Sequence, residues 1–195
     1  MFSAQNFSFA SDRFSSYPDR YRSFNRRQTI PLETNVLWRI ESGFVRTLTS
    51  DEDGTLTTLG FGKCGDVFGL PLIDIQPYWV ECLTAVKIKR FLPRSPEDRE
   101  TLAAIQFSQA QQARELLRIS HCKRVESRLL KLFSWLGRSI GQKRERHYFI
   151  PLHLTHQDLA DTVGTTRVTV TRLMNELQRT GRIRDTPGGY FLGNH

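Results

Sequence analysis

Residues 155–180 constrain the fold of this chain most, because they combine a capped helix start, a tight glycine and apolar spacing. Thr155 can cap a helix, and Asp158 three residues later can accept from its N–H, as in a capping box. Gly164 then supplies the backbone freedom that a tight turn needs. Beyond it, apolar residues recur at spacings of three and four, which marks the inner face of a second helix. The pattern predicts a helix-turn-helix, and a purely structural helical hairpin is the alternative.

The second helix, expected over residues 166–179, carries two arginines on its outer face near its N-terminus. A helix-turn-helix inserts this end into the DNA major groove. Arginine pairs with guanine O6 and N7, and a small apolar group contacts the thymine methyl. We therefore predict four base-reading residues, which are Arg167, Val168, Thr171 and Arg172. Nearby hydroxyl, amide and helix-end N–H groups suit phosphate oxygens. These phosphate candidates are Thr155, His156, Gln157, Thr165, Thr166, Thr169 and Asn175.

The positive charge of the chain concentrates in its C-terminal part. The net charge is +8, yet residues 1–119 hold 15 Lys and Arg against 14 Asp and Glu. Residues 120–195 hold 13 against six. Two short strands expected around Pro187–Gly189 form a wing beside the second helix. The basic half favours double-stranded DNA as a partner, with a solvated basic surface as the alternative.

Residues 36–91 carry the signals of a small antiparallel β domain. Short runs rich in Val, Ile, Leu, Thr and aromatic residues are separated by turn residues, including the good hairpin turn at 51–54. This spacing predicts a sandwich or roll. Before it, residues 1–27 are rich in Phe, Tyr, Ser and Arg and have poor periodicity, so we expect a loosely ordered arm that docks by its aromatic side chains. A transit peptide is the alternative, which Asp12 and Asp19 disfavour.

Residues 96–119 contain no glycine or proline after their start, so they predict one long helix. Spacing by three and four selects a stripe with apolar ends and a glutamine centre. Such a stripe can form the seam of a dimer, in which buried polar residues fix the register. Packing against the chain's own sheet is the alternative. The stripe consists of Leu102, Ile105, Gln109, Gln112, Leu116 and Ile119.

Several classes of protein are excluded by what the sequence lacks. No apolar run approaches the roughly 18 residues that a bilayer span needs, and no secretory signal opens the chain. The three cysteines Cys64, Cys82 and Cys122 are too few and too dispersed for a disulfide framework. We therefore expect a reduced, cytoplasmic protein with no membrane partner.

The order of these parts resembles the CRP/FNR superfamily of bacterial transcription regulators from about Ile30 to the C-terminus. The implied fold class is α+β. It has a shortened, cyclic-nucleotide-binding-like β-roll over 28–93, a dimerisation helix over 94–120 and a winged helix-turn-helix over 121–195, behind the arm over 1–27. Residues 166–173 are similar to the recognition helix of the cyanobacterial global nitrogen regulator. The resemblance implies a homodimer on a palindrome with GTA and TAC half-sites one turn apart, with RNA polymerase as a further partner.

The sensor end departs from the family pattern. Residues 65–69 resemble the start of the cyclic-nucleotide phosphate cassette, but residues 70–78 lack the arginine that pairs with the phosphate. Cyclic AMP is therefore not expected. An iron–sulfur cluster is not expected either, because residues 1–63 contain no cysteine. All five histidines lie at or beyond His121, which argues against haem or a metal in the roll. No cofactor is predicted and the effector is unknown, so effector-independent and redox-responsive regulation through Cys64 both stay open.

Two other functions compete with a sequence-specific regulator. A cupin-like enzyme fused to a DNA-binding domain would need a histidine cluster in the β domain, which has no histidine. No base–nucleophile motif is present either, so we expect no enzyme activity. A non-specific architectural DNA protein fits poorly with a modest charge and a base-reading face, and it would show salt-dependent binding without sequence preference.

Overall fold

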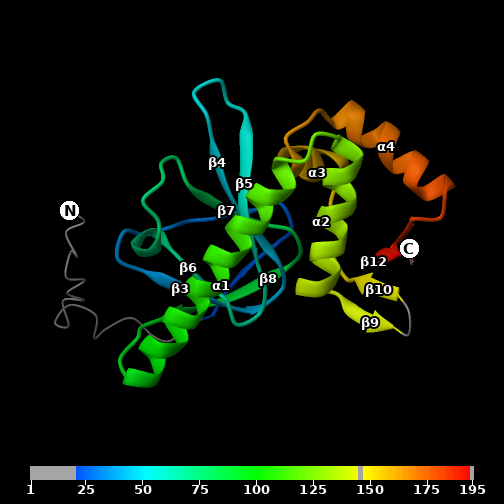
Figure 1. Cartoon of the computed structure of the whole chain (residues 1–195). Coiled ribbons are helices and arrows are strands. Elements are labelled where there is room, and N and C mark those ends of the chain that lie inside the picture. The colour runs from blue at the N-terminus through cyan, green and yellow to red at the C-terminus, as the bar shows by residue number, and fades with distance from the viewer. Residues whose placement is uncertain (1–20, 145–146, 194–195) are drawn as a thin grey trace.

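The computed structural model describes residues 21–144 and 147–193, so most of the expected arm, residues 1–20, lies outside it. The N-terminal half is a roll of two antiparallel sheets, ordered β1-β8-β3-β6 and β2-β7-β4-β5 (Figure 1). A 3-10 turn at Leu70–Leu72 follows β6. The strands are β1 (Arg22–Phe24), β2 (Thr29–Ile30), β3 (Leu37–Ser42), β4 (Val45–Ser50), β5 (Leu56–Gly62), β6 (Val67–Phe68), β7 (Trp79–Cys82) and β8 (Val86–Phe91).

The segment around β1 and β2 is more ordered than its sequence predicts. Arg22 pairs with Ile88 in one sheet, and Thr29 pairs with Glu81 in the other. The backbone N–H of Arg27 donates to the carbonyl of Cys82 at 2.7 Å. The expectation of a loosely ordered arm is therefore wrong for residues 22–24. Strands of two and three residues are too short to show a period-two pattern, which is why the sequence conceals them.

Helix α1 (Pro96–Ser120) lies along the roll and begins at a capping box of Ser95 and Asp98. Its predicted seam faces the chain's own sheets. Leu102 and Ile105 pack on a small cluster of Leu37, Val67 and Phe91, and Leu116 and Ile119 join the main core. The prediction that this stripe is the dimer seam is therefore wrong, and the alternative of packing on the chain's own sheet holds.

The two glutamines of that stripe have a physical reason to face the roll. The Gln109 amide donates to the carbonyl of Val67 at 2.8 Å. The Gln112 amide donates to the carbonyl of Phe61 at 3.0 Å and its oxygen accepts from the Phe61 N–H. Buried backbone groups at the rim of the sheets need such partners. The polar residues in the middle of this apolar stripe therefore satisfy backbone hydrogen-bonding groups of the roll.

In its described residues, the C-terminal half is built from four short strands and three helices. Helix α2 (Val125–Ser139) continues through Gly137, although glycine is a poor helix former. A Cβ at Gly137 would lie 3.1 Å from the Cβ of Tyr148, so the glycine serves close packing of helix on sheet. The sheet order is β11-β12-β10-β9. The elements are α2 (Val125–Ser139), β9 (Gln142–Arg144), β10 (His147–Ile150), α3 (His156–Val163), α4 (Arg167–Arg179), β11 (Ile183–Thr186) and β12 (Gly189–Leu192).

One hydrophobic core joins the two halves. It contains residues of α1, α2, α3 and α4 together with Phe61 and Leu83 of the roll, and a second cluster fills the inside of the roll. Among the described helices, none is long and apolar enough to span a membrane. The α+β class with a roll, a long helix and a C-terminal winged helix-turn-helix agrees with the sequence-based prediction.

Candidate nucleic-acid interface

Helix α3 is held at both ends by the devices that the sequence predicts. The Thr155 hydroxyl accepts from the Asp158 N–H at 3.2 Å, and the Asp158 carboxylate accepts from the Thr155 N–H at 2.8 Å. Gly164 ends the helix in the left-handed conformation with φ of 66°, which a residue with a Cβ adopts at a cost. The turn closes where the Thr165 N–H donates to the carbonyl of Ala160 at 3.1 Å. These contacts fix where the second helix begins.

Helix α4 is anchored by its inner face and capped by Thr166, whose hydroxyl accepts from the Thr169 N–H at 3.2 Å. Four apolar residues at spacings of three, one and three are at most 6% exposed. Their burial leaves the opposite side of the helix, at its N-terminal end, in solvent. The four are Val170, Leu173, Met174 and Leu177.

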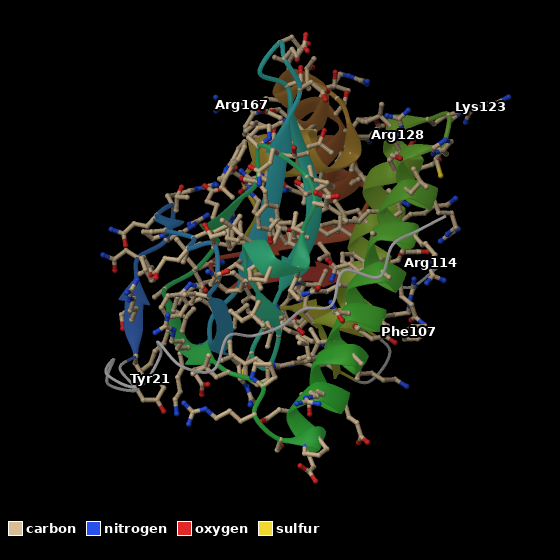
Figure 2. The ribbon with its side chains drawn as sticks, turned by 90° about the vertical axis from the view of Figure 1, so that its left-hand side faces the viewer. Tyr21, Phe107, Arg114, Lys123, Arg128 and Arg167 are labelled. Carbon is tan, nitrogen blue, oxygen red and sulfur yellow. The ribbon has the colours of Figure 1, made fainter. Side chains whose placement is uncertain are left out.

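Three of the four predicted base readers lie on that open side. Arg167 and Arg172 are exposed, and Val168 is 78% exposed, which is unusual for an aliphatic side chain. Figure 2 labels Arg167 in the upper part of the molecule. The fourth, Thr171, is half-buried, and its hydroxyl donates to the Arg167 carbonyl at 2.9 Å and bonds His156 Nδ1 at 2.8 Å. The geometry thus brings two guanidinium groups and one apolar side chain together on a rigid helix end.

The predicted phosphate candidates separate into free and engaged groups. Gln157 and Asn175 are exposed, and the Gln157 amide donates to Asp161 at 2.7 Å. The Thr166 and Thr169 hydroxyls bond each other at 2.9 Å, and the half-buried His156 is bonded to Thr171. Thr155 is half-buried, and its hydroxyl accepts from the Arg27 guanidinium at 3.0 Å. Protein groups therefore already occupy the N-terminus of α3.

Arg128 of α2 braces the turn between the two helices, a role that the sequence analysis missed. Its guanidinium donates to the carbonyls of Val163 and Gly164 at 3.0 and 3.1 Å, and to the carbonyl of Cys122 at 2.7 Å. The carbonyls of Val163 and Gly164 belong to the C-terminal end of α3, where a cation is favourable. Val163 and Gly164 lie 35 and 36 residues from Arg128 in the sequence, so only the fold reveals these partners.

A second missed feature is a charged network between the roll and α3. Arg27 and Arg46 of the roll bind Asp158 and Asp161 of α3, and Glu81 of β7 completes the group. Burial alone would raise the pKa of Asp158. The hydrogen bond from Arg27 and the charge of Arg46 outweigh burial and lower the pKa of Asp158 below its usual value. The Asp158 carboxylate holds the pKa of the Arg27 guanidinium above its ordinary range.

The roll contains a cavity of about 320 Å³ between its sheets and α1. Most of its walls are apolar, with Thr47, Asp66 and three glutamines of α1 among the polar groups. Burial raises the pKa of Asp66. Neither lysine nor arginine is among the described residues that line this cavity. Within residues 21–144 and 147–193, no group of three or more potential metal ligands gathers either.

Residues 123–192 match the model of the Crp-like helix-turn-helix domain. Over 162 residues the chain is 38% identical to the regulatory protein CysR of Synechococcus elongatus, which covers 81% of this chain and 76% of that protein. The chain belongs to the CRP/FNR family. The transcriptional regulator SdrP of Thermus thermophilus is 32% identical over 165 residues, which is 82% of this chain and 80% of that protein.

Two solved structures of proteins from Thermus thermophilus share the CRP/FNR fold. The transcriptional regulator TTHB099 superposes with a TM-score of 0.74 at 23% identity and covers 89% of this chain and 92% of its own. TTHA1359, described as a CRP/FNR-family regulator, superposes with a TM-score of 0.70 at 26% identity over 90% and 94% of the two chains. These relatives are transcription regulators rather than enzymes. The chain is a transcription regulator of this family with a helix-turn-helix DNA-binding domain.

Proposed function

We propose that this CRP/FNR-family chain is a homodimer that reads a palindromic promoter site with helix α4. The observation that carries the proposal is the exposed group of Arg167, Val168 and Arg172 at the N-terminal end of a capped and fully anchored helix. A rigid helix end with two free arginines suits bidentate pairing with guanine in the major groove. Thr171 contributes its methyl group, because its hydroxyl is bonded within the protein.

Phosphate contacts in this proposal come from groups around the reading face. Gln157 and Asn175 are exposed, and Thr165, Thr166 and Thr169 lie at the N-terminus of α4, where helix N–H groups attract anions. Thr155 and His156 take a supporting role, since their side chains bond Arg27 and Thr171. Such contacts set the register of the protein on the duplex rather than its sequence preference.

Dimerisation in this proposal uses a second face of α1, distinct from the stripe that packs on the roll, although its member Ala110 also lies at the cavity between α1 and the sheets. A second stripe with spacings of four, three, four and three runs along this face, and all its members are exposed. Phe107 is 60% exposed and Leu117 is 59% exposed, and Figure 2 labels Phe107 and Arg114 on the side of α1 away from the sheets. Spacing of this kind forms the seam of paired helices. The stripe consists of Ala103, Phe107, Ala110, Arg114 and Leu117.

The roll of the proposed regulator does not respond to cyclic AMP. A buried phosphate needs a fixed cation, and the described lining of the cavity offers apolar side chains and amides instead. A regulator active without an effector, or one that senses another signal, fits this cavity better. RNA polymerase is the further protein partner that we propose for the promoter-bound regulator.

Selection of bound sequences from a random DNA pool tests the proposal, with and without metabolites from a cell extract. We expect an inverted repeat whose half-sites lie one helical turn apart and whose enrichment does not depend on cyclic AMP. Salt-dependent binding with no enriched sequence would contradict a sequence-specific role. Enrichment of an isolated half-site would contradict the dimer.

A further inference from the structure

Five charged side chains meet where the roll contacts α3, close to the DNA-binding end of the molecule. Two are arginines of the roll, one is a glutamate of the roll, and two are aspartates of α3. Four of the five are at most 14% exposed. The group consists of Arg27, Arg46, Glu81, Asp158 and Asp161.

Arg46 is the centre of this network. Its Nε donates to Glu81 at 2.6 Å, while Nη2 lies 3.0 Å from Asp158 and Nη1 donates to Asp161 at 3.1 Å. The Arg46 side chain is 5% exposed, so its charge depends on these three carboxylates. A guanidinium can satisfy several acceptors in one plane, which a lysine cannot do.

Arg27 forms the outer part of the network and makes a bidentate contact with the Asp158 carboxylate. Its Nη1 donates to Asp158 Oδ1 at 2.7 Å and its Nη2 donates to Asp158 Oδ2 at 2.8 Å. Nη2 also donates to the Thr155 hydroxyl at 3.0 Å, so Arg27 bonds both members of the α3 capping box. The backbone of Arg27 is left-handed, with φ of 72°, an uncommon conformation for a residue with a side chain. The contacts of the Arg27 guanidinium with the Asp158 carboxylate, and the hydrogen bond from the Arg27 N–H to the Cys82 carbonyl, hold the residue in this conformation.

Further contacts extend the attachment along α3. The Thr58 and Thr162 hydroxyls bond each other at 3.0 Å in the interior, and the Arg26 guanidinium donates to the carbonyl of His153 at 3.1 Å. Helix α3 is therefore held to the roll from its N-cap to its last turn. The reading face of α4 stays open in this arrangement, since Arg167 and Arg172 are exposed.

We propose that Arg27 is a positioning residue for DNA recognition, which clamps α3 to the roll and so fixes the direction in which α4 faces. The inference rests on the proposed dimeric function, because only a dimer must present two recognition helices at one spacing. Because the clamped arrangement leaves the reading face free, the clamp prepares the protein for binding. Nη1 and Nη2 of Arg27 are both bonded to α3, which favours positioning over direct contact with a phosphate.

The first test compares wild-type protein with Arg27→Gln on duplexes whose half-sites are moved apart one base pair at a time. We expect the variant to bind the optimal duplex about tenfold more weakly, because it must order its domains on binding. We also expect a flatter dependence on spacing and an unchanged base preference within each half-site. A direct phosphate contact would instead lower the salt slope by about one for each arginine lost and leave the spacing optimum sharp.

Two further variants serve as controls. Arg22→Gln removes the same charge from the same segment, but Arg22 contacts Glu33 at 3.5 Å and lies over the Trp38 ring, and both of these partners belong to the roll rather than to α3. We therefore expect wild-type DNA binding and a wild-type spacing optimum. Arg27→Lys keeps the charge but loses the bidentate hydrogen bonding of the guanidinium, so we expect an intermediate affinity and an intermediate dependence on half-site spacing. A sharp spacing optimum in Arg27→Gln, or tighter binding than wild type, would overturn the clamp.

Hydrogen exchange without DNA tests the clamp independently of the DNA site. We expect the amides of α3 to exchange several-fold faster in Arg27→Gln, with α2 unchanged. Equal exchange over α3 in both proteins would overturn the clamp whatever the DNA experiment shows. A wild-type protein that has no spacing optimum, but whose α3 is loosened by Arg27→Gln, would contradict the proposed dimeric function and leave the clamp standing.

Discussion

At the scale of single residues, Asp158 links helix formation to domain attachment. Its carboxylate closes the capping box of α3 and accepts from Arg27, and it lies 3.0 Å from Arg46. The side chain is 1% exposed, so its charge is stable only because these donors surround it. One side chain therefore begins the first helix of the DNA-binding motif and anchors that motif to the roll.

Asp158→Asn should lower stability at neutral pH by about 3 kcal/mol, because it removes a buried charged partner of two arginines. Burial opposes ionisation of Asp158, but Arg27 and Arg46 hold its folded-state pKa below the ordinary value of 3.8. The stabilisation is therefore complete above about pH 4 and is lost as the pH falls through the lower folded-state pKa. Thermal unfolding measured from pH 7 to pH 3 should show the gap between wild type and variant closing below pH 4.

The exposed Asp74 provides the control for that experiment. Asp74→Asn should leave the melting temperature within about 1 °C of wild type at every pH, since surface substitutions away from special contacts change stability little. A difference in melting temperature between wild type and Asp158→Asn that stays constant down to pH 3 would contradict stabilisation by the Asp158 charge.

The cysteines differ in reactivity for reasons of burial and charge. Burial, assisted by the neighbouring Glu81 charge, raises the pKa of the Cys82 thiol to about 11, and the side chain is fully buried. Cys64 is exposed. At pH 8 a thiol reagent should modify Cys64 in the folded protein and reach Cys82 only after unfolding, as mass spectrometry of timed samples can measure. Modification of both at one rate in the native protein would be incompatible with this roll.

At the scale of elements, α1 presents two stripes of three-and-four spacing, and periodicity alone cannot assign them. Gln109 and Gln112 resemble register-setting polar residues of a seam, yet their amides complete the backbone hydrogen bonding of the roll. The stripe with Phe107 and Leu117 remains exposed. The choice between the two depends on contacts with strands that lie more than 40 residues away in the sequence.

Phe107→Glu should weaken the proposed dimer, because it places a charge in the centre of an apolar seam. We expect the monomer–dimer dissociation constant from sedimentation to rise at least tenfold, and affinity for a palindrome to fall with it. Ser108→Glu is the matched control, since Ser108 is exposed on the same helix but lies off the stripe. An equal loss in both variants, or no loss in either, would contradict the proposed seam.

At the scale of the whole molecule, local patterns predict much of the DNA-binding half and little of its attachment. The capping box of Thr155 and the turn at Gly164 depend on neighbours within four residues, so the sequence reveals them. Arg27 and Asp158 lie 131 residues apart, and only the folded chain brings them together. The presence of helix α4 and the exposure of Arg167 could be predicted from the sequence. The contact between Arg27 and Asp158, which attaches α3 to the roll, could not.

The most direct test of the account is competition binding by Arg167→Ala on a selected palindrome and its single-base variants. Arg179→Ala is the matched control, because Arg179 is exposed in the last turn of the same helix, away from the proposed reading end. We predict that Arg167→Ala weakens binding by about 1–3 kcal/mol and loses preference at one base pair in each half-site, while Arg179→Ala keeps every preference. Unchanged affinity and unchanged base preference in Arg167→Ala would contradict the assignment of α4 as the helix that reads DNA.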